Sequence, residues 1–270
     1  MARADREDTE TLRGALMAGV QMLATFLLIP RLEVVEALAL AGFDAIVIDL
    51  EHGPIASVDV QTLAAVAQGA GMYAIARVGD NSEVEIGRVL DAGVDGILVP
   101  HVSSTSAAMQ IVKSGRFPPA GDRSINPYVR GNHYGFDRAG QYERLNLSIA
   151  LLAMLEGAPA VNEIESICAI SELDGVFIGA VDLAASLGLS DDAEHSEVIS
   201  LINQIIERVH RKGKRVGIYA PTPEAAGRWF KQGVGLVAMS TDSAMAGRSF
   251  VREREAALEC AGSDANAAVT

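Results

Sequence analysis

The sequence predicts a single (β/α)8 barrel over residues 1–270, a closed ring of parallel strands surrounded by helices. Three observations favour this fold. Eight short apolar runs alternate with eight longer amphipathic runs. Most of the short runs are apolar throughout, as expected for strands that are covered on both faces. The chain has 270 residues, which is typical of one barrel.

The predicted elements follow one another in strict alternation. The strands are Thr25–Ile29, Ala45–Leu50, Tyr73–Arg77, Gly96–His101, Ala150–Glu156, Gly175–Gly179, Arg215–Tyr219 and Gly235–Met239. The helices are Leu32–Ala41, Val58–Ala70, Ser82–Ala92, Thr105–Ser114, Val161–Ile170, Ser196–Lys212, Pro223–Gln232 and Ser243–Ala261. Ser57 is a candidate helix cap, and Thr222-Pro223-Glu224 combines a cap, a first-turn proline and an early acid.

A glycine recurs where helices are predicted to end. It occurs in Ala41-Gly42-Phe43-Asp44, in Ala92-Gly93-Val94-Asp95 and in Gln232-Gly233-Val234-Gly235. Each segment reads as a helix that is closed by a left-handed glycine and followed by a strand. No Gly-x-Gly-x-x-Gly pattern follows the first strand, which argues against an open dinucleotide-binding sheet.

Two segments depart from this alternation. The stretch 116–147 is long and rich in proline and glycine, so we expect a loop without secondary structure that serves as a lid or a subunit contact. The tail 262–270 is small and polar, which predicts disorder.

Composition excludes several classes of partner. The net charge of −13 argues against nucleic acid, whose binding needs a basic face. The apolar run from Ala15 to Pro30 is too short and too interrupted to span a membrane. Cys168 and Cys260 lie far apart and match no metal-site spacing, so a cytoplasmic location is expected.

Ionisable residues follow the ends of several predicted strands. In a barrel these ends meet at one mouth, where active sites form. Glu156 and Asp182 each follow a buried run on neighbouring strands, which lie about 5 Å apart. The two carboxylates are suited to share Mg²⁺ or Mn²⁺. The alternative is that each caps the next helix or pairs with an arginine.

Three more residues are candidates at this mouth. His52 is placed as a general base, with a structural histidine at a strand end as the alternative. Arg77 is placed as a carboxylate clamp, and its alternative is a salt bridge to Glu51 or Asp49. His101 either lines the site or packs beside it.

A set of motifs runs in order along nearly the whole chain. The motifs are Gly42-Phe43-Asp44, Ile48-Asp49-Leu50-Glu51-His52-Gly53, Leu90-Asp91-Ala92-Gly93, Gly96-Ile97-Leu98-Val99-Pro100, Phe117-Pro118-Pro119-Ala120-Gly121-Asp122-Arg123, Asp174-Gly175-Val176-Phe177-Ile178-Gly179-Ala180-Val181-Asp182-Leu183 and Ser186-Leu187-Gly188. Together they resemble the HpcH/HpaI family of class II pyruvate aldolases, of the 4-hydroxy-2-oxoheptanedioate or 2-dehydro-3-deoxyglucarate aldolase type.

The resemblance implies a metal-dependent enzyme that cleaves 4-hydroxy-2-oxo acids into pyruvate and an aldehyde. It implies the following residues: Glu156 and Asp182 as ligands of Mg²⁺, Mn²⁺ or Co²⁺; His52 as the base with Asp91 as its acidic partner; Arg77 for pyruvate; and Ala180, Val181 and Tyr219 along the substrate pocket. It also implies a hexamer that exchanges its C-terminal helix, here Ser243–Ala261, between subunits.

The sequence departs from the family pattern around these residues. Met154 stands where glutamine is common, Val181 is bulkier than the usual alanine, and Tyr219 replaces a smaller apolar residue. Two alternatives therefore stay open. One is a related enzyme, such as a siderophore-type citrate synthase or an acyl-CoA lyase. The other is a non-catalytic barrel that binds a 2-oxo acid.

Overall fold

The computed structural model, which describes residues 11–136 and 138–265, confirms the predicted barrel. Its strands are β1 (Met22–Leu27), β2 (Ala45–Asp49), β3 (Tyr73–Arg77), β4 (Gly96–Val99), β5 (Ala150–Leu155), β6 (Gly175–Ile178), β7 (Arg215–Ala220) and β8 (Leu236–Thr241). Each strand pairs in parallel with the next, and β1 closes the ring on β8. The register of β1 on β8 shifts between Ala24 and Phe26, and the other strand pairs are continuous.

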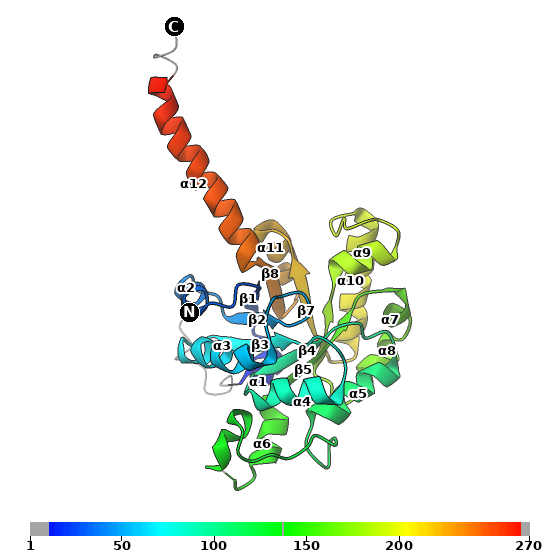
Figure 1. Cartoon of the computed structure of the whole chain (residues 1–270). Helices are drawn as coiled ribbons and strands as arrows, with labels where there is room; N and C mark the ends of the chain where they lie inside the picture. Colours follow the sequence, from blue (N-terminus) through cyan, green and yellow to red (C-terminus); the bar gives the residue numbers. More distant parts are fainter. Residues whose placement is uncertain (1–10, 137, 266–270) are drawn as a thin grey trace.

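Helices surround this barrel (Figure 1). They are α1 (Leu12–Met17), α2 (Leu32–Leu40), α3 (Ser57–Gly69), α4 (Glu83–Asp91), α5 (Thr105–Gly115), α6 (Gln141–Ser148), α7 (Ala158–Asn162), α8 (Ile164–Cys168), α9 (Ala180–Ser186), α10 (Ser196–Arg211), α11 (Pro223–Lys231) and α12 (Asp242–Ala265). The predicted helix Val161–Ile170 is two short helices, α7 and α8, which meet at Glu163. Thr222 caps α11 by accepting a hydrogen bond from the Ala225 N–H, as its sequence predicts.

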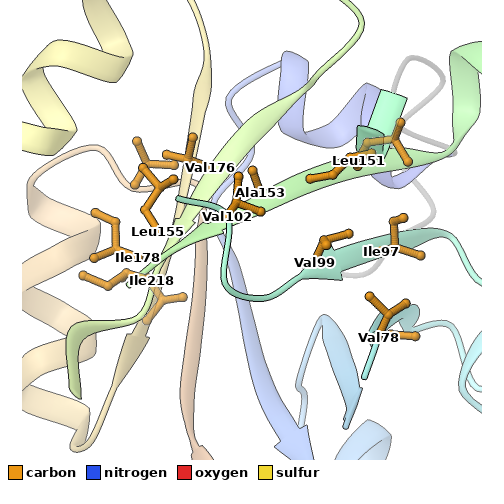
Figure 2. Close-up of a cluster of buried hydrophobic side chains, with 14 of the residues drawn as sticks. Val78, Ile97, Val99, Val102, Leu151, Ala153, Leu155, Val176, Ile178 and Ile218 are labelled. Carbon is orange, nitrogen blue, oxygen red and sulfur yellow. The ribbon is translucent and has the colours of Figure 1, made fainter. Parts of the chain in front are cut away.

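Successive side chains of each strand alternate between two hydrophobic cores. Along β5, Leu151, Ala153 and Leu155 point outward and pack against the helices, together with side chains of β4, β6 and β7 (Figure 2). Ala150, Leu152 and Met154 point inward and pack in the barrel interior. Because the period of a strand is two, every second residue past Met154 continues toward the axis of the mouth.

Buried ion pairs close the opposite end of the barrel. Asp174, which precedes β6, has no exposed side-chain surface. Its Oδ1 lies 2.6 Å from Arg13 Nε, and its Oδ2 lies 2.6 Å from Arg116 Nη2. Asp174 Oδ2 also accepts a hydrogen bond of 2.8 Å from the Leu151 N–H. This network joins α1, the end of α5 and the starts of β5 and β6, so its contribution is to stability.

The expectation for the stretch 116–147 is wrong in one respect, because this stretch contains regular structure. A 3-10 helix, η2 (Arg130–Gly135), and then α6 occur in it. These elements are too short to stand out by periodicity. The segment connects a helix to the next strand, so it lies at the barrel end opposite the mouth. Arg130 accordingly donates hydrogen bonds to the carbonyl oxygens of Ala92 and Gly93, which follow α4 at that end.

The last helix, α12, projects away from the barrel (Figure 1). Its apolar side chains Phe250, Val251 and Leu258 are exposed. Although α12 is long, neither it nor any other described helix is apolar enough over its length to cross a bilayer. The predicted tail 262–270 is helical as far as Ala265, and its remainder lies outside the described residues.

Candidate active site

The inward side chains at the carboxyl ends of the strands line a cavity of about 320 Å³ at the barrel mouth. Its lining residues are Phe26, Leu28, Asp49, His52, Arg77, Met154, Gly179, Ala180, Val181, Asp182, Tyr219 and Thr241. A larger cavity of about 690 Å³ lies at the opposite end, beside η2 and α6. We assign the site to the smaller cavity because the strand-end carboxylates, arginine and histidine converge there.

Arg77 lies at the end of β3 and is buried. Its Nε donates to Asp49 Oδ1 at 2.9 Å, and its Nη2 donates to Asp49 Oδ2 at 2.7 Å. Its Nη1 lies 3.0 Å from Glu51 Oε2, so both predicted salt bridges form. A guanidinium carries five N–H donors, and these contacts leave donors for a ligand in the cavity. Arg77 is therefore held rigidly as the positive charge of the site.

His52 and Glu51 follow β2 in the order that the sequence predicts. The His52 imidazole is exposed and lines the cavity, with Nε2 4.0 Å from Glu51 Oε2. Glu51 is buried, and neither of its carboxylate oxygens has a well-aligned hydrogen-bond partner among the described residues. Buried, under-satisfied oxygens favour a nearby cation or ordered water. The arrangement gives His52 access to the cavity and a carboxylate beside it.

Glu156 and Asp182 come together at the mouth. Glu156 follows β5 with its side chain 8% exposed, and burial raises the pKa of its carboxyl group. Contacts with His101 lower the pKa of Glu156 in part, and the negative charges of Glu51 and Asp182 raise it. A buried carboxylate that two acidic neighbours repel is stabilised by a bound cation.

The donor set at Glu156 and Asp182 fits a hard divalent metal. Gly179 gives Glu156 its space, since a Cβ at that position would lie 2.8 Å from Glu156 Cγ. Among residues 11–136 and 138–265, no three histidine, cysteine or acidic side chains already converge as a complete metal site. Two carboxylates fit a cation that keeps water and substrate as its other ligands, as Mg²⁺ and Mn²⁺ do.

His101 contacts the same carboxylates from outside the cavity. Its ring nitrogen Nδ1 lies 2.8 Å from Glu156 Oε2, and Nε2 lies 2.8 Å from Glu51 Oε1. Its backbone N–H also donates to Glu156 Oε2 at 2.8 Å. The sequence left two positions open for His101, lining the site or packing beside it, and neither describes its position fully. It bridges two acidic residues of the site.

One wall of the cavity is apolar. The rings of Phe26 and Tyr219 meet edge to face at 6.1 Å, and the Arg77 guanidinium lies 4.8 Å from the Phe26 ring centre. Met154 is buried in the barrel interior below them. Burial also raises the pKa of Tyr219, so its hydroxyl stays protonated and neutral. Val181 and Tyr219, two of the residues expected along the substrate pocket, both line this cavity.

Asp91 does not join this site within one chain. It ends α4, which places it at the barrel end opposite the mouth. There its Oδ1 accepts a hydrogen bond of 2.9 Å from Arg123 Nη2. The Arg123 guanidinium is buried against the Phe117 ring, 4.4 Å from its centre. The structure thus brings together the other predicted site residues, but separates Asp91 from His52.

Sequence reasoning missed Phe26, Leu28 and Thr241 as lining residues. Phe26 lies on the inward-facing side of β1, and Leu28 directly follows that strand, at alternate positions after Ala24. A signal existed, because extending the inward alternation by one or two positions reaches them. Thr241 ends β8 and gives no such signal.

Comparisons with known proteins show which family this chain resembles. The family model described as HpcH/HpaI aldolase/citrate lyase matches residues 23–247. The 5-keto-4-deoxy-D-glucarate aldolase of Klebsiella pneumoniae is 38% identical over 77% of this chain and 80% of its own length. The crystal structure of citrate synthase SbnG aligns with a TM-score of 0.85 and 30% identity, covering 93% of this chain and 99% of that one. An HpcH/HpaI family protein from Burkholderia cenocepacia aligns with a TM-score of 0.86 and 29% identity, covering 91% and 98%.

Proposed function

Because this chain belongs to the HpcH/HpaI aldolase/citrate lyase family, we propose that it is a class II aldolase that cleaves or forms 4-hydroxy-2-oxo acids through the enolate of pyruvate. The observation that carries the proposal is the convergence of Asp182, Arg77 and His52 at one cavity, with the Glu156 carboxylate beside it, close enough for the charges of Asp182 and Glu51 to act on it. The 5-keto-4-deoxy-D-glucarate aldolases support it, because they align over most of this chain.

Glu156 and Asp182 would hold the divalent cation, Mg²⁺ or Mn²⁺, with Co²⁺ as a further candidate. When bound, the cation supplies Lewis-acid stabilisation of the negative charge that develops on the keto oxygen of the substrate. The buried setting of Glu156 strengthens this electrostatic effect, since a site that excludes water screens charge weakly. Water and the 2-oxo acid complete the ligand set.

Arg77 binds and orients the 2-oxo acid. Its guanidinium is fixed by Asp49 and Glu51, so it presents its remaining N–H groups to the cavity without a loss of rotational freedom. Its positive charge also stabilises the enolate. Ala180 and Val181, at the start of α9, and Tyr219 shape the part of the cavity that receives the aldehyde.

His52 transfers the proton of the 4-hydroxyl group in both cleavage and addition. In cleavage it accepts the proton of the 4-hydroxyl group, directly or through water, while the C3–C4 bond breaks and the aldehyde leaves. The electron pair of that bond remains as the enolate, which takes a proton at C3 to become pyruvate. Addition reverses these steps. The exposed position of the His52 imidazole at the cavity allows this exchange with solvent.

Asp91 supports His52 from a second copy of the chain, since one chain holds the two residues at opposite ends of its barrel. The homo-oligomer, a hexamer by resemblance, also accounts for α12. This helix extends beyond the barrel with Phe250, Val251 and Leu258 exposed, and burying them against a neighbour stabilises both. Arg123 fixes the Asp91 carboxylate for such a contact.

A related reaction is a second candidate. Citrate synthase SbnG shares 30% identity and nearly the whole fold with this chain. Met154 favours this second reaction. It lines the cavity where the 2-oxo acid is expected to bind, and its thioether cannot donate a hydrogen bond to the keto oxygen. In that reaction the same enolate chemistry meets a different electrophile.

The direct experiment is a screen of 4-hydroxy-2-oxo acids with released pyruvate as the readout, with Mn²⁺ and with excess EDTA. We expect metal-dependent pyruvate release from at least one acid. A protein that enolises pyruvate with metal but cleaves none of these acids would favour the synthase. A protein that does neither would be a non-catalytic 2-oxo acid-binding barrel, and the proposal would be wrong.

A further inference from the structure

His101 has a backbone conformation that is uncommon for a residue with a side chain. It follows β4 with a φ of 56°, in the left-handed region. Histidine pays a conformational cost there, so the surrounding contacts have to favour that conformation. The turn directs its backbone N–H and its imidazole ring toward the same oxygen, Glu156 Oε2, and both lie 2.8 Å from it.

The imidazole covers two buried carboxylates. Its side chain is 72% exposed, whereas Glu51 and Glu156 beneath it are 7% and 8% exposed. Each ring nitrogen contacts a different one, at 2.8 Å. Glu51 in turn lies 3.0 Å from Arg77 Nη1. A continuous chain of contacts therefore runs from Glu156 through His101 and Glu51 to Arg77.

The two oxygens of Glu156 have different surroundings. Oε2 is engaged by His101. Oε1 lies on the side of Gly179, 3.4 Å from where a Cβ would be, and Asp182 follows three residues later in the first turn of α9. A carboxylate that is held through one oxygen leaves the other aimed in a fixed direction. Here that direction is toward Gly179, which precedes the first turn of α9.

We propose that His101 is a positioning residue of the metal centre, which holds Glu156 by Oε2 so that Oε1 faces the cation, and which couples this ligand to Arg77 through Glu51. The inference rests on the proposed metal-dependent function. His101 is not a ligand itself in this account. It raises metal affinity because it fixes the carboxylate in advance and covers it from solvent.

The test measures Mn²⁺ binding by calorimetry without pyruvate. Asparagine tolerates the left-handed backbone, so His101→Asn keeps the backbone N–H contact and removes the imidazole. We expect Mn²⁺ affinity to fall about 10- to 100-fold. His133→Asn is the matched control, because His133 also has a left-handed φ of 49° but lies in η2 at the other end of the barrel. The Mn²⁺ affinity of His133→Asn should equal that of the wild type.

Two further measurements separate positioning from folding. Saturating Mn²⁺ should restore the turnover number of His101→Asn, which a folding defect would not allow. In a double-mutant cycle, Glu51→Gln should weaken Mn²⁺ binding in the wild-type background and have little further effect beside His101→Asn. Additive losses would show that Glu51 does not act through His101.

Pulsed electron paramagnetic resonance of bound Mn²⁺ identifies the role of the ring. We expect no nitrogen coupling of the strength that a directly bound imidazole gives. Strong nitrogen coupling that disappears in His101→Asn would make His101 a ligand and overturn the positioning role. Unchanged Mn²⁺ affinity in His101→Asn would overturn the inference while leaving the aldolase proposal intact. Failure of the wild type to bind Mn²⁺ at all would overturn both.

Discussion

Arg77 faces Asp49 across neighbouring strands with two parallel hydrogen bonds of 2.9 and 2.7 Å. The two residues are directly paired in the register of β2 and β3, and both are buried. This fork–fork geometry fixes the guanidinium plane as well as its position. The orientation of the site's main positive charge is thus a consequence of strand register.

The first prediction concerns this geometry. Arg77→Lys keeps the charge but cannot form two parallel hydrogen bonds to Asp49 while it also binds a ligand. We expect pyruvate binding, measured by calorimetry with Mn²⁺ present, to weaken by about tenfold or more, the effect of one lost charge-assisted hydrogen bond. Arg208→Lys is the control, because Arg208 makes an equally bidentate pair with Glu165 on the surface. Equal pyruvate affinity in wild type and Arg77→Lys would show that the fork does not matter.

The second prediction concerns stability. Asp174→Asn removes the negative charge between Arg13 and Arg116 at the closed end of the barrel. An unpaired buried guanidinium is costly, so the free energy of unfolding in urea should fall by about 3–5 kcal/mol. Glu194→Gln breaks the more exposed pair with Arg228 and should cost less than about 1 kcal/mol. Similar small losses in both variants would contradict the assignment of the Asp174 network to stability.

Much of this fold could be predicted from the sequence, because buried parallel strands read as continuous apolar runs. The bounds predicted for β3 agree with the structure, and those for β2, β4, β5, β6 and β7 differ at one end. The helices of 130–148 could not be predicted, since short helices depend on tertiary contacts such as those of Arg130 with Ala92 and Gly93.

The candidate site, too, could be predicted from the sequence only in part. Glu156, Asp182, Arg77 and His52 lie at or just after the carboxyl ends of apolar strands, so topology alone brings them to one end of the barrel. The bridging position of His101 depends on a left-handed backbone that one sequence does not reveal. The separation of Asp91 from His52 follows from the direction of α4, which carries its last residue to the other end of the barrel.

The third prediction concerns thiol reactivity and pH. Burial raises the pKa of Cys168 to about 11, whereas Cys260 is exposed on α12. Alkylation near pH 8, followed by mass spectrometry, should therefore label Cys260 and spare Cys168. The unfolded thiol ionises near its ordinary value of 9.0, so folding stability should decrease as the pH rises from about 9 to 11. Equal labelling of both cysteines in the folded protein would contradict this burial.

The fourth prediction concerns assembly. Deleting residues 249–270 removes the exposed part of α12, including Phe250, Val251 and Leu258. We expect the mass measured by light scattering to drop from that of an oligomer to that of a smaller species, since the buried apolar area is lost. A shorter deletion of residues 266–270 should leave the mass per assembly unchanged. An unaltered oligomer in the longer deletion would place the subunit interface elsewhere.

The central claim is that Glu156 and Asp182 hold the cation that makes pyruvate enolisation possible. The measurement is deuterium uptake at C3 of pyruvate, followed by nuclear magnetic resonance with Mg²⁺ or Mn²⁺. The account predicts exchange in the wild type, its loss with EDTA, and its loss in Glu156→Gln and Asp182→Asn at the metal concentrations that saturate the wild type. Exchange that continues undiminished in EDTA, or in either variant, would contradict it.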